Sequence, residues 1–260
     1  MSFDIIGSEK KAVAIIEVRE GQDEKSLAEK ILKENKNVAS VLKKLSERKG
    51  DYRTREYKLV SGDQNTEVLH KEFGYLLKVD PQKAYFSPRE ATERQRISQL
   101  VKPNETIAVF FAGIGSFAIA IAKIQPAVKK IFAIELNPTA VNYMKDNIRI
   151  NKVAHLVTAL QGDVKEVSKK FNGVCDRVLM PLPVEAQKFL EEAISCAKKN
   201  GIIHYYTIVE DTDLAGVCVD TEMINETAKQ LNRGIKILSE QKVLPFSPHK
   251  WKYRIDFQVI

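Results

Sequence analysis

The spacing of apolar residues changes at about residue 85. Beyond it, short runs rich in β-branched and aromatic residues alternate with segments whose apolar residues recur at helical spacing. The runs predict strands at residues 107–111, 130–135, 156–160, 174–180 and 202–208. The intervening segments predict helices at residues 89–100, 116–123, 138–150 and 184–198, and one more that ends near Asn232-Arg233-Gly234. Two last strands, near 236–243 and 252–259, have no helix between them.

This alternation predicts an α/β domain over residues 85–260, with a mainly parallel sheet covered on both faces and an antiparallel pair at one edge. Residues 1–84 predict a separate, small α+β domain. Its strands are expected at 12–18, 57–60, 67–71 and 75–79, and its helix at 26–45. The helix rests on apolar residues at helical spacing: Leu27, Ile31, Leu32, Val38, Val41 and Leu42.

The composition is that of a folded protein, and its positive net charge is compatible with binding a polyanion such as RNA. Hydrophobic residues make up 44% of the chain and charged residues 29%, and the net charge is +7. Two basic clusters are candidates for RNA binding because phosphates favour cations and exposed aromatics stack on bases. They contain Lys43, Lys44, Lys49 and Arg55 in the first, and His249, Lys250 and Trp251 in the second. A solvated helix face explains the first cluster equally well.

Other classes of protein are disfavoured. No apolar run reaches the roughly 20 residues that cross a bilayer, and the amino end lacks the pattern of a secretory signal. The three cysteines, Cys175, Cys196 and Cys218, are too scattered for a disulfide framework or a zinc site. We therefore expect a cytoplasmic protein without metal, and we expect it to act as a monomer.

Candidate ligand-binding residues follow three successive strands. Gly113 and Gly115 form a turn after the first strand of the α/β sheet, and Glu135 ends the next strand about twenty residues later, where a carboxylate can accept both ribose hydroxyls. Asp163 ends the third strand and can accept from an adenine amino group. A lone GxG turn is weak evidence, so the two carboxylates carry the prediction of an adenosine-containing cofactor.

The sequence of the turn is also compatible with a dinucleotide cofactor such as NAD. The dinucleotide-binding fingerprint asks for glycine or alanine at its third position, which here is Ala118. Two features favour S-adenosylmethionine. The antiparallel ending is the one found in methyltransferases, and a phosphate-free sulfonium cation suits two carboxylates better than a dinucleotide does. The fold class is therefore a Rossmann-like class I methyltransferase sheet preceded by a small α+β domain.

Motifs along nearly the whole chain resemble one family. They read YFSPR from Tyr85, TER from Thr92, FAGIGSF, AIELNP, DNIRINK, QGDVKEV, DRVLMPLP and HYYTIVE. In combination they resemble the archaeal and eukaryotic tRNA (guanine-37-N1) methyltransferases and their wyosine-forming relatives. The resemblance starts at the family's second domain, so the further amino-terminal domain of many members is expected to be absent.

The resemblance implies roles for particular residues. The residues expected in the cofactor pocket are Tyr85, Arg89, Phe111, Gly113, Gly115, Glu135, Asn137, Asp163, Pro181 and Pro183. Arg89 would pair with the methionine carboxylate. Glu93 matches the proposed general base and Arg53 the arginine that holds the base oxygen, with Arg55 as second choice. Guanine N1 carries a proton, so its methylation needs such a base and such a cation. Without the resemblance, Glu93 and Arg94 would be read as ordinary charges on a helix surface.

Two positions depart from the family pattern. Val109 stands where a typical member has an acid that supports the turn, and Pro181 stands where the guanine-N1 branch has asparagine. Proline offers no side-chain hydrogen bond, so the target base must be held differently. Within the family, proline here resembles the archaeal branch that methylates 4-demethylwyosine at carbon 7, in some members besides guanine N1.

The resulting hypothesis is a methyltransferase for purine 37 of tRNA, acting on 4-demethylwyosine at C7, on guanosine at N1, or on both. Three alternatives stay open. The chain could bind RNA without catalysis, methylate another RNA or a protein, or transfer the aminocarboxypropyl group of the same cofactor. The orientation of the methionine chain, set by Tyr85 and Arg89, would separate the last alternative from methyl transfer.

Overall fold

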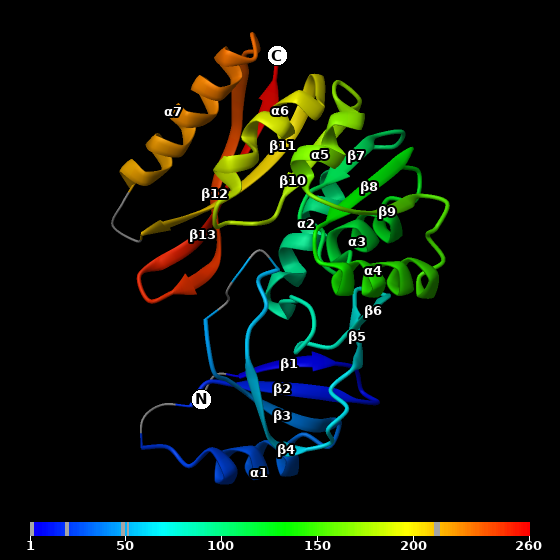
Figure 1. Ribbon diagram of the computed structural model, residues 1–260, viewed down its shortest axis with the longest axis vertical. Coiled ribbons are helices and arrows are strands. Elements are labelled where there is room, and N and C mark those ends of the chain that lie inside the picture. The colour runs from blue at the N-terminus through cyan, green and yellow to red at the C-terminus, as the bar shows by residue number, and fades with distance from the viewer. Residues whose placement is uncertain (1–2, 19–20, 48–49, 51, 211–213) are drawn as a thin grey trace.

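The computed structural model describes residues 3–18, 21–47, 50, 52–210 and 214–260, and only the backbone of 214–219. Its largest sheet has seven strands in the order β12-β13-β11-β10-β7-β8-β9 (Figure 1). These strands are β7 (Thr106–Val109), β8 (Lys130–Glu135), β9 (Val157–Gln161), β10 (Cys175–Met180), β11 (Ala197–Glu210), β12 (Ile235–Ser247) and β13 (Lys250–Val259). The strands from β9 to β11 are parallel, and β13 runs antiparallel to β11 and β12. The predicted sheet and its antiparallel ending are confirmed.

Helices cover both faces of this sheet. They are α2 (Ala91–Leu100), α3 (Ser116–Ile124), α4 (Pro138–Ile150), α5 (Val164–Val167), α6 (Leu190–Cys196) and α7 (Leu214–Gln230), with short 3-10 turns η1 (Pro88–Glu90), η2 (Ser168–Phe171) and η3 (Ala186–Phe189). Alternate residues of β7 enter opposite cores. Ile107 and Val109 pack with α2, α3 and α4, whereas Ala108 packs with α5, α6 and α7. The chain order reverses between β7 and β10, so a ligand site is expected beyond the carboxyl ends of these two strands.

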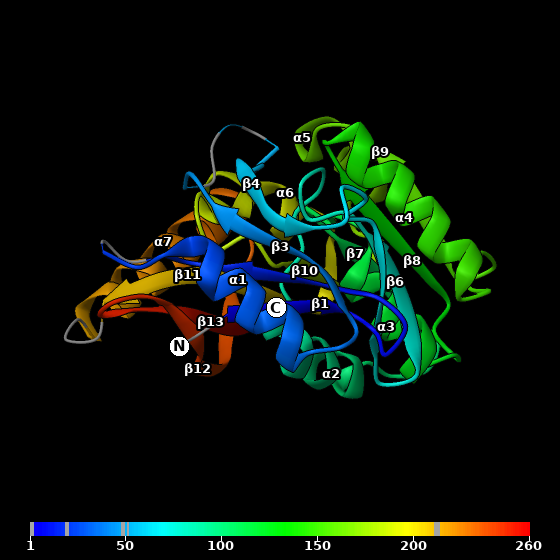
Figure 2. The ribbon, with the colours of Figure 1, turned by 90° about the horizontal axis from the view of Figure 1, so that it is seen from below.

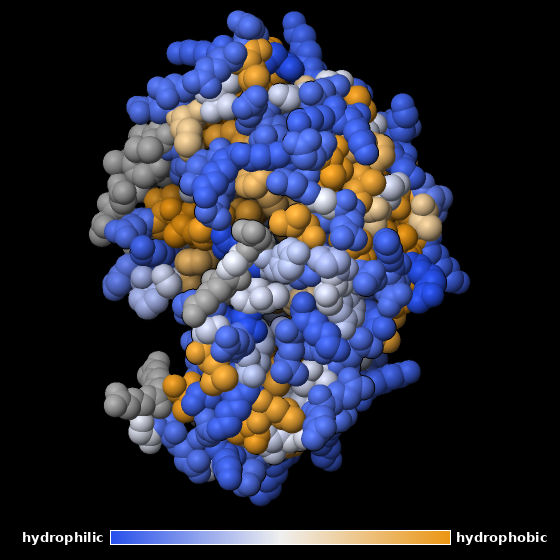
Figure 3. Space-filling model, in the orientation of Figure 1, coloured by the Kyte–Doolittle hydropathy of each residue, from blue (hydrophilic) through white to orange (hydrophobic). Residues whose placement is uncertain are grey.

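A second, four-stranded sheet lies below the first in Figure 1. It contains β1 (Phe3–Gly7), β2 (Ala12–Ile16), β3 (Val38–Lys44) and β4 (Tyr57–Gly62), in that order. The helix α1 (Glu24–Glu34) covers its outer face, as Figure 2 shows from below. Its other face contributes Ile6, Val13, Ile15 and Leu42 to the same core as α2 and α3. A notch separates the two parts at the left edge of the mostly hydrophilic surface in Figure 3.

The predicted helix at 26–45 is wrong beyond residue 34. The Asn35 backbone and side-chain N–H groups both donate to the Ile31 carbonyl, which ends α1 there. The chain then enters β3 and pairs in parallel with β2. The apolar residues at 38, 41 and 42 continue the helical spacing by coincidence. This segment forms a strand because it pairs with the edge of β2, and that pairing outweighs the local spacing.

A hairpin links the two sheets. Its strands, β5 (Val68–Glu72) and β6 (Tyr75–Val79), are joined by Phe73 and Gly74, whose φ angles of 36° and 87° fit a primed hairpin turn. The outer edge of β6 is satisfied by two buried side chains, one from α4 and one from the residue that caps its carboxyl end. Asn151 bonds to both backbone groups of Leu76, and Asn147 to both of Lys78. One turn of helix separates the two amides, so together they imitate a neighbouring strand.

Several classes of feature are absent from the part of the chain that the structure describes. No helix there combines the length and the apolarity that a bilayer span requires. No group of three or more His, Cys, Asp or Glu side chains there could hold a metal ion. Cys175 and Cys196 are buried free thiols, and the side chain of Cys218 lies outside the described residues.

Candidate functional site

The turn after β7 is built by backbone hydrogen bonds to the neighbouring strand β8. Ala112 N–H donates to the Ile134 carbonyl at 2.9 Å, and Gly113 N–H donates to Glu135 Oε2 at 2.8 Å. Phe111 and Gly113 take φ angles of 53° and 55°. The Glu135 carboxylate therefore supports the turn from outside, which is the task expected of the acid that Val109 replaces. Val109 itself is fully buried in the core.

The two glycines of the turn differ in what surrounds the position that a side chain would occupy. A Cβ on Gly115, at φ +83°, would lie 2.8 Å from Cγ of the buried Met144, so this glycine lets α3 approach α4. A Cβ on Gly113 would find only the Tyr85 carbonyl oxygen, 3.7 Å away. The backbone is therefore more open at Gly113, whereas Gly115 has a packing role whether or not it also faces the cofactor as expected.

Glu135 is partly enclosed, and burial raises the pKa of its carboxyl while bonds from the Gly113 and Asn137 N–H groups lower it, with a net rise. Asn137 Oδ1 accepts from Thr139 and Ala140 N–H, so this side chain caps α4. The side-chain oxygen of Asn137 is thus engaged in capping α4, which restricts the bonds that it can offer to a cofactor.

Asp163 is exposed at the end of β9 and caps α5, where its carboxylate accepts from Lys165 N–H at 2.9 Å. β9 pairs with β8, so Asp163 and Glu135 lie at the same edge of the sheet. Phe111 packs edge-on against Phe189, with ring centroids 4.8 Å apart. The residues predicted from three strand ends are therefore neighbours, as the parallel topology requires.

The segment after β10 faces this edge. The Leu182 N–H donates to the Met180 carbonyl, which folds the chain tightly around Pro181. Pro181 and Pro183 are both partly exposed. The segment is also held from the connection between β3 and β4: Arg53 Nη2 donates to the Val184 carbonyl at 3.0 Å and lies 4.0 Å from Glu185 Oε2. We refer to residues 181–184 as the proline loop.

Both candidate arginines lie near Tyr85. Arg53, Arg55 and Tyr85 line one small hollow together with Tyr57 and Phe86. Arg53 has a positive φ of 50° and extends toward the proline loop, whereas Arg55 Nη2 lies 3.4 Å from Glu47 Oε2. The geometry favours Arg53 over Arg55 as the cation that faces an acceptor.

Arg89 is placed differently from the expectation. Its Nε donates to Asp4 Oδ1 at 2.6 Å, and half of its side chain is exposed. It lines a cleft of about 230 Å³ between the small sheet and the turn of β12 and β13, together with Lys44 and Phe246. In this arrangement the guanidinium is paired with a carboxylate of β1, so the predicted partner of the methionine carboxylate is engaged elsewhere.

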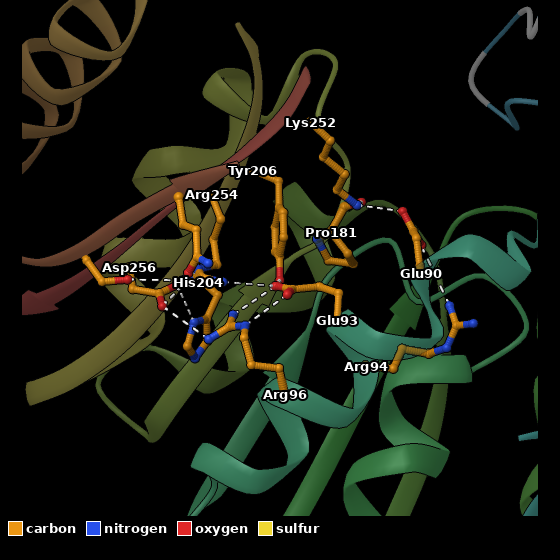
Figure 4. A network of polar contacts seen from close by, with 12 residues as sticks. Glu90, Glu93, Arg94, Arg96, Pro181, His204, Tyr206, Lys252, Arg254 and Asp256 are labelled. Atoms are coloured by element: carbon orange, nitrogen blue, oxygen red, sulfur yellow. Dashed lines mark hydrogen bonds and ion pairs between the residues drawn. The ribbon is translucent and has the colours of Figure 1, made fainter. Parts of the chain in front are cut away.

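Glu93 is buried and already bonded at both oxygens (Figure 4). Its Oε1 accepts from Tyr206 Oη at 2.5 Å, and Arg96 donates to both oxygens at 2.8 Å. Burial raises the pKa of Glu93, but the bonds from Arg96 and Tyr206 lower it below its ordinary value. These donors hold the carboxylate in its ionised, proton-accepting form, and Oε2, which accepts from Arg96 alone among the described residues, keeps a lone pair for a proton.

The network continues across β11 and β13. Asp256 bonds to His204 Nδ1 at 2.6 Å and lies 3.6 Å from Arg96, and Lys252 bonds to Glu90 at 2.6 Å. The sequence argument missed this network, although a signal was present. Polar residues alternate along both strands, at 204 and 206 and at 252, 254 and 256, and in a strand such residues share one face. Here α2 covers that face, and most of these polar groups pair with one another, although Arg254 Nε makes no hydrogen bond to the described residues.

The predicted RNA-binding cations are mostly paired. Lys43 lies 2.8 Å from Glu24, Lys44 bonds to Glu17, and Lys250 lies 3.2 Å from Glu210. Lys43 and Lys44 belong to strand β3, so the helix-face explanation of this cluster is wrong. Lys49 lies outside the described residues. His249 occupies the exposed turn before β13, and Lys242 covers the Trp251 ring at 4.9 Å.

Comparisons with known proteins agree on one family. A sequence profile of the TRM5/TYW2 methyltransferase domain matches residues 68–237. A tRNA (guanine(37)-N(1))-methyltransferase of Pyrococcus abyssi is 39% identical over 260 residues, covering 99% of this chain and 74% of that protein. A tRNA(Phe) (4-demethylwyosine(37)-C(7)) aminocarboxypropyltransferase of Methanocaldococcus jannaschii is 35% identical over 209 residues, covering 80% of each. The crystal structure of TYW2 from P. horikoshii in complex with MeSAdo is 29% identical, with a TM-score of 0.84 over 100% of this chain and 90% of that one.

Proposed function

Because the chain belongs to the TRM5/TYW2 methyltransferase family, we propose that it is an S-adenosylmethionine-dependent tRNA methyltransferase acting at purine 37. One observation carries the proposal. The turn that holds Gly113 against Glu135 lies at the same sheet edge as the proline loop, and Arg53 reaches that loop from the connection between β3 and β4. A cofactor side and an acceptor side thus meet at the topological switch point.

The residues at the turn fit the cofactor. S-adenosylmethionine would supply an electrophilic methyl group. The two oxygens of Glu135 each accept one backbone N–H, and each keeps a lone pair for a ribose hydroxyl. The open side of Gly113 supports a place for the nucleoside there, and the exposed Asp163 would accept from the adenine amino group.

On the acceptor side, the Arg53 guanidinium would stabilise charge developing on the purine oxygen. Glu93 would receive the proton of the acceptor on a lone pair that its bonds to Tyr206 and Arg96 leave unused. Pro181 supports the choice of acceptor, because it presents no side-chain donor or amide to a purine edge. We propose 4-demethylwyosine C7, guanosine N1, or both as acceptor atoms, with the anticodon stem-loop as the part of tRNA that is bound.

Residues 1–84 are proposed to form the domain that supports this reaction and contacts RNA, with the protein acting as a monomer. Arg53 carries the first part of this proposal, because it is the described side chain that extends from this region to the proline loop.

The test uses two substrates. Purified protein and labelled methyl donor are incubated with tRNA carrying guanosine 37, and separately with tRNA carrying the wyosine precursor, and the nucleosides are analysed by mass spectrometry. A methylated residue 37 in either tRNA is expected, with Glu93→Ala much slower. Absence of transfer to residue 37 in both would falsify the proposal.

A second candidate is aminocarboxypropyl transfer to the same base. The pairing of Arg89 with Asp4 favours it, because the methionine carboxylate then lacks its expected partner and the methionine chain is free to take another orientation. The mass of the product nucleoside separates the two, since one reaction adds a single carbon and the other a four-carbon amino acid group. Asp4→Asn should raise methyl transfer relative to aminocarboxypropyl transfer if the pairing decides the orientation.

A further inference from the structure

A fully buried lysine contacts the proline loop at a different carbonyl from Arg53. Lys252 Nζ lies 2.6 Å from Glu90 Oε1 and 3.3 Å from the Pro181 carbonyl oxygen. Figure 4 shows its side chain extending from β13 toward both groups. The Glu90 carboxylate is buried as well and lies 3.8 Å from Arg94. One ammonium group thus joins β13, η1 and the proline loop.

A lysine is an expensive choice at this position. An apolar side chain would avoid the desolvation of an ammonium ion, which a buried pair often fails to recover. What an apolar side chain cannot do is donate a hydrogen bond. Proline has no N–H, so its carbonyl is the one group through which a hydrogen bond can hold Pro181. The donor on Lys252 therefore fixes a residue that the sequence leaves without other polar anchors.

The same ammonium also lies over the ring of Tyr206, which bonds to the candidate base Glu93. Lys252 Nζ lies 4.5 Å from the centroid of the Tyr206 ring, and the Tyr206 hydroxyl donates to Glu93. A cation over the ring face attracts the aromatic electrons and strengthens the hydroxyl as a donor. Lys252 thus contacts the proline loop directly and Glu93 through the side chain of Tyr206.

We propose that Lys252 is a positioning residue that sets the place of the proline loop and thereby the choice of acceptor purine. This rests on the proposed function. Arg53 holds the loop at the Val184 carbonyl and Lys252 holds it at the Pro181 carbonyl, so the two ends are fixed by cations from different parts of the molecule. A shift of the loop changes the distance between acceptor and cofactor without touching the Glu135 side of the site.

The test compares Lys252→Met, Lys252→Arg and the double variant Lys252→Met/Glu90→Gln, which removes both buried charges and protects against misfolding. Lys236→Met, an exposed lysine on β12, is the control. For each protein, kcat and KM are measured on guanosine-37 tRNA and on precursor-bearing tRNA, cofactor affinity by calorimetry, and hydrogen exchange of residues 180–185 by mass spectrometry.

We expect Lys252→Met and the double variant to lose about tenfold or more in kcat, unequally on the two tRNAs, with cofactor affinity within about twofold of wild type. Exchange in the proline loop should rise, and Lys252→Arg should restore part of kcat. Equal loss on both tRNAs with unchanged exchange overturns the proposal, as does unchanged kcat. If the wild-type protein transfers no methyl group, the proposed function and the role of Lys252 in acceptor choice both fail. The exchange comparison then still decides whether Lys252 holds the loop.

Discussion

Arg53 and Val184 are 131 residues apart in the chain, and the Arg53 guanidinium donates a hydrogen bond of 3.0 Å to the Val184 carbonyl. This bond joins the connection between β3 and β4 to the proline loop. The same guanidinium lies 4.0 Å from Glu185 Oε2, at the edge where the acceptor base is proposed to enter. Arg53 thus combines a structural contact with the role proposed for it in catalysis.

Replacing Arg53 should impair the chemical step more than cofactor binding. We expect Arg53→Met to lower kcat by about 100-fold, since a positioned cation at a developing oxyanion contributes on that order. Cofactor affinity by calorimetry should stay unchanged. Arg55→Met is the matched control, because Arg55 lines the same hollow but turns toward Glu47. A larger kcat loss in Arg55→Met than in Arg53→Met would reverse the assignment.

Asp163→Asn separates cofactor binding from helix capping. Asparagine caps as well as aspartate, so the bond to Lys165 N–H and the stability should persist within about 0.5 kcal/mol. If the carboxylate accepts from adenine, the dissociation constant for S-adenosylmethionine should rise about tenfold, which corresponds to about 1.4 kcal/mol. Calorimetry gives the affinity and denaturant unfolding the stability. Unchanged affinity would remove Asp163 from the pocket.

Gly115→Ala tests the packing role of the second glycine. Any L-residue in the left-handed region costs about 1–2 kcal/mol. At Gly115 the added methyl also meets buried Met144 at 2.8 Å, so the loss should exceed the backbone cost by about 1 kcal/mol or more. Gly74→Ala supplies the comparison, because Gly74 has a similar φ of 87° and open space around it. If Gly115→Ala and Gly74→Ala lose the same free energy of unfolding in urea, the Met144 side chain must move aside without cost.

The buried ion pair of Glu72 and Arg94 should make the free energy of unfolding depend on pH in the acid range. Burial raises the pKa of Glu72, but bonds from His70 and Arg94 outweigh it and lower the pKa to about 2 from 4.5. A carboxyl with a depressed folded pKa stabilises the protein above its unfolded pKa and loses that effect as pH falls. The stability difference between wild type and Glu72→Gln should therefore be full above about pH 4.5 and shrink toward pH 2.

At neutral pH, Glu72→Gln should cost about 3 kcal/mol, because the buried Arg94 loses its hydrogen-bonded carboxylate and keeps only Glu90, 3.8 Å away, among the described carboxylates. Unfolding in urea at several pH values measures the difference. Glu34→Gln, which alters an exposed pair with Lys30, is the control and should show no such pH trend. A pH-independent difference would mean that the pair adds no ionic stabilisation.

Tyr206→Phe should move the acid limb of the pH profile. The Tyr206 hydroxyl is one of the donors that lower the pKa of Glu93, so its loss should raise that pKa. If Glu93 is the base, kcat/KM should begin to fall at a higher pH than in wild type. Tyr205→Phe is the matched control, since Tyr205 is adjacent in the chain but bonds to Asp220 on the other face of β11. A limb that stays in place would argue against Glu93 as the base.

The sequence by itself determined the parallel sheet, its antiparallel ending and the strand ends that carry Gly113, Glu135 and Asp163. These depend on local periodicity and on the rule that parallel strands end at one edge, both of which are readable along the chain. The same reading extended α1 into β3, because three apolar positions fit both spacings and strand pairing with β2 is not local.

Only the tertiary structure decided which partner each charge takes. Arg89 pairs with Asp4, Glu93 with Tyr206 and Arg96, and Lys252 with Glu90 and the Pro181 carbonyl. A titratable residue chooses among partners by distance and burial, and these are set when distant segments pack together. The roles of the helix α2 and of the proline loop therefore follow from contacts across the fold and not from their motifs alone.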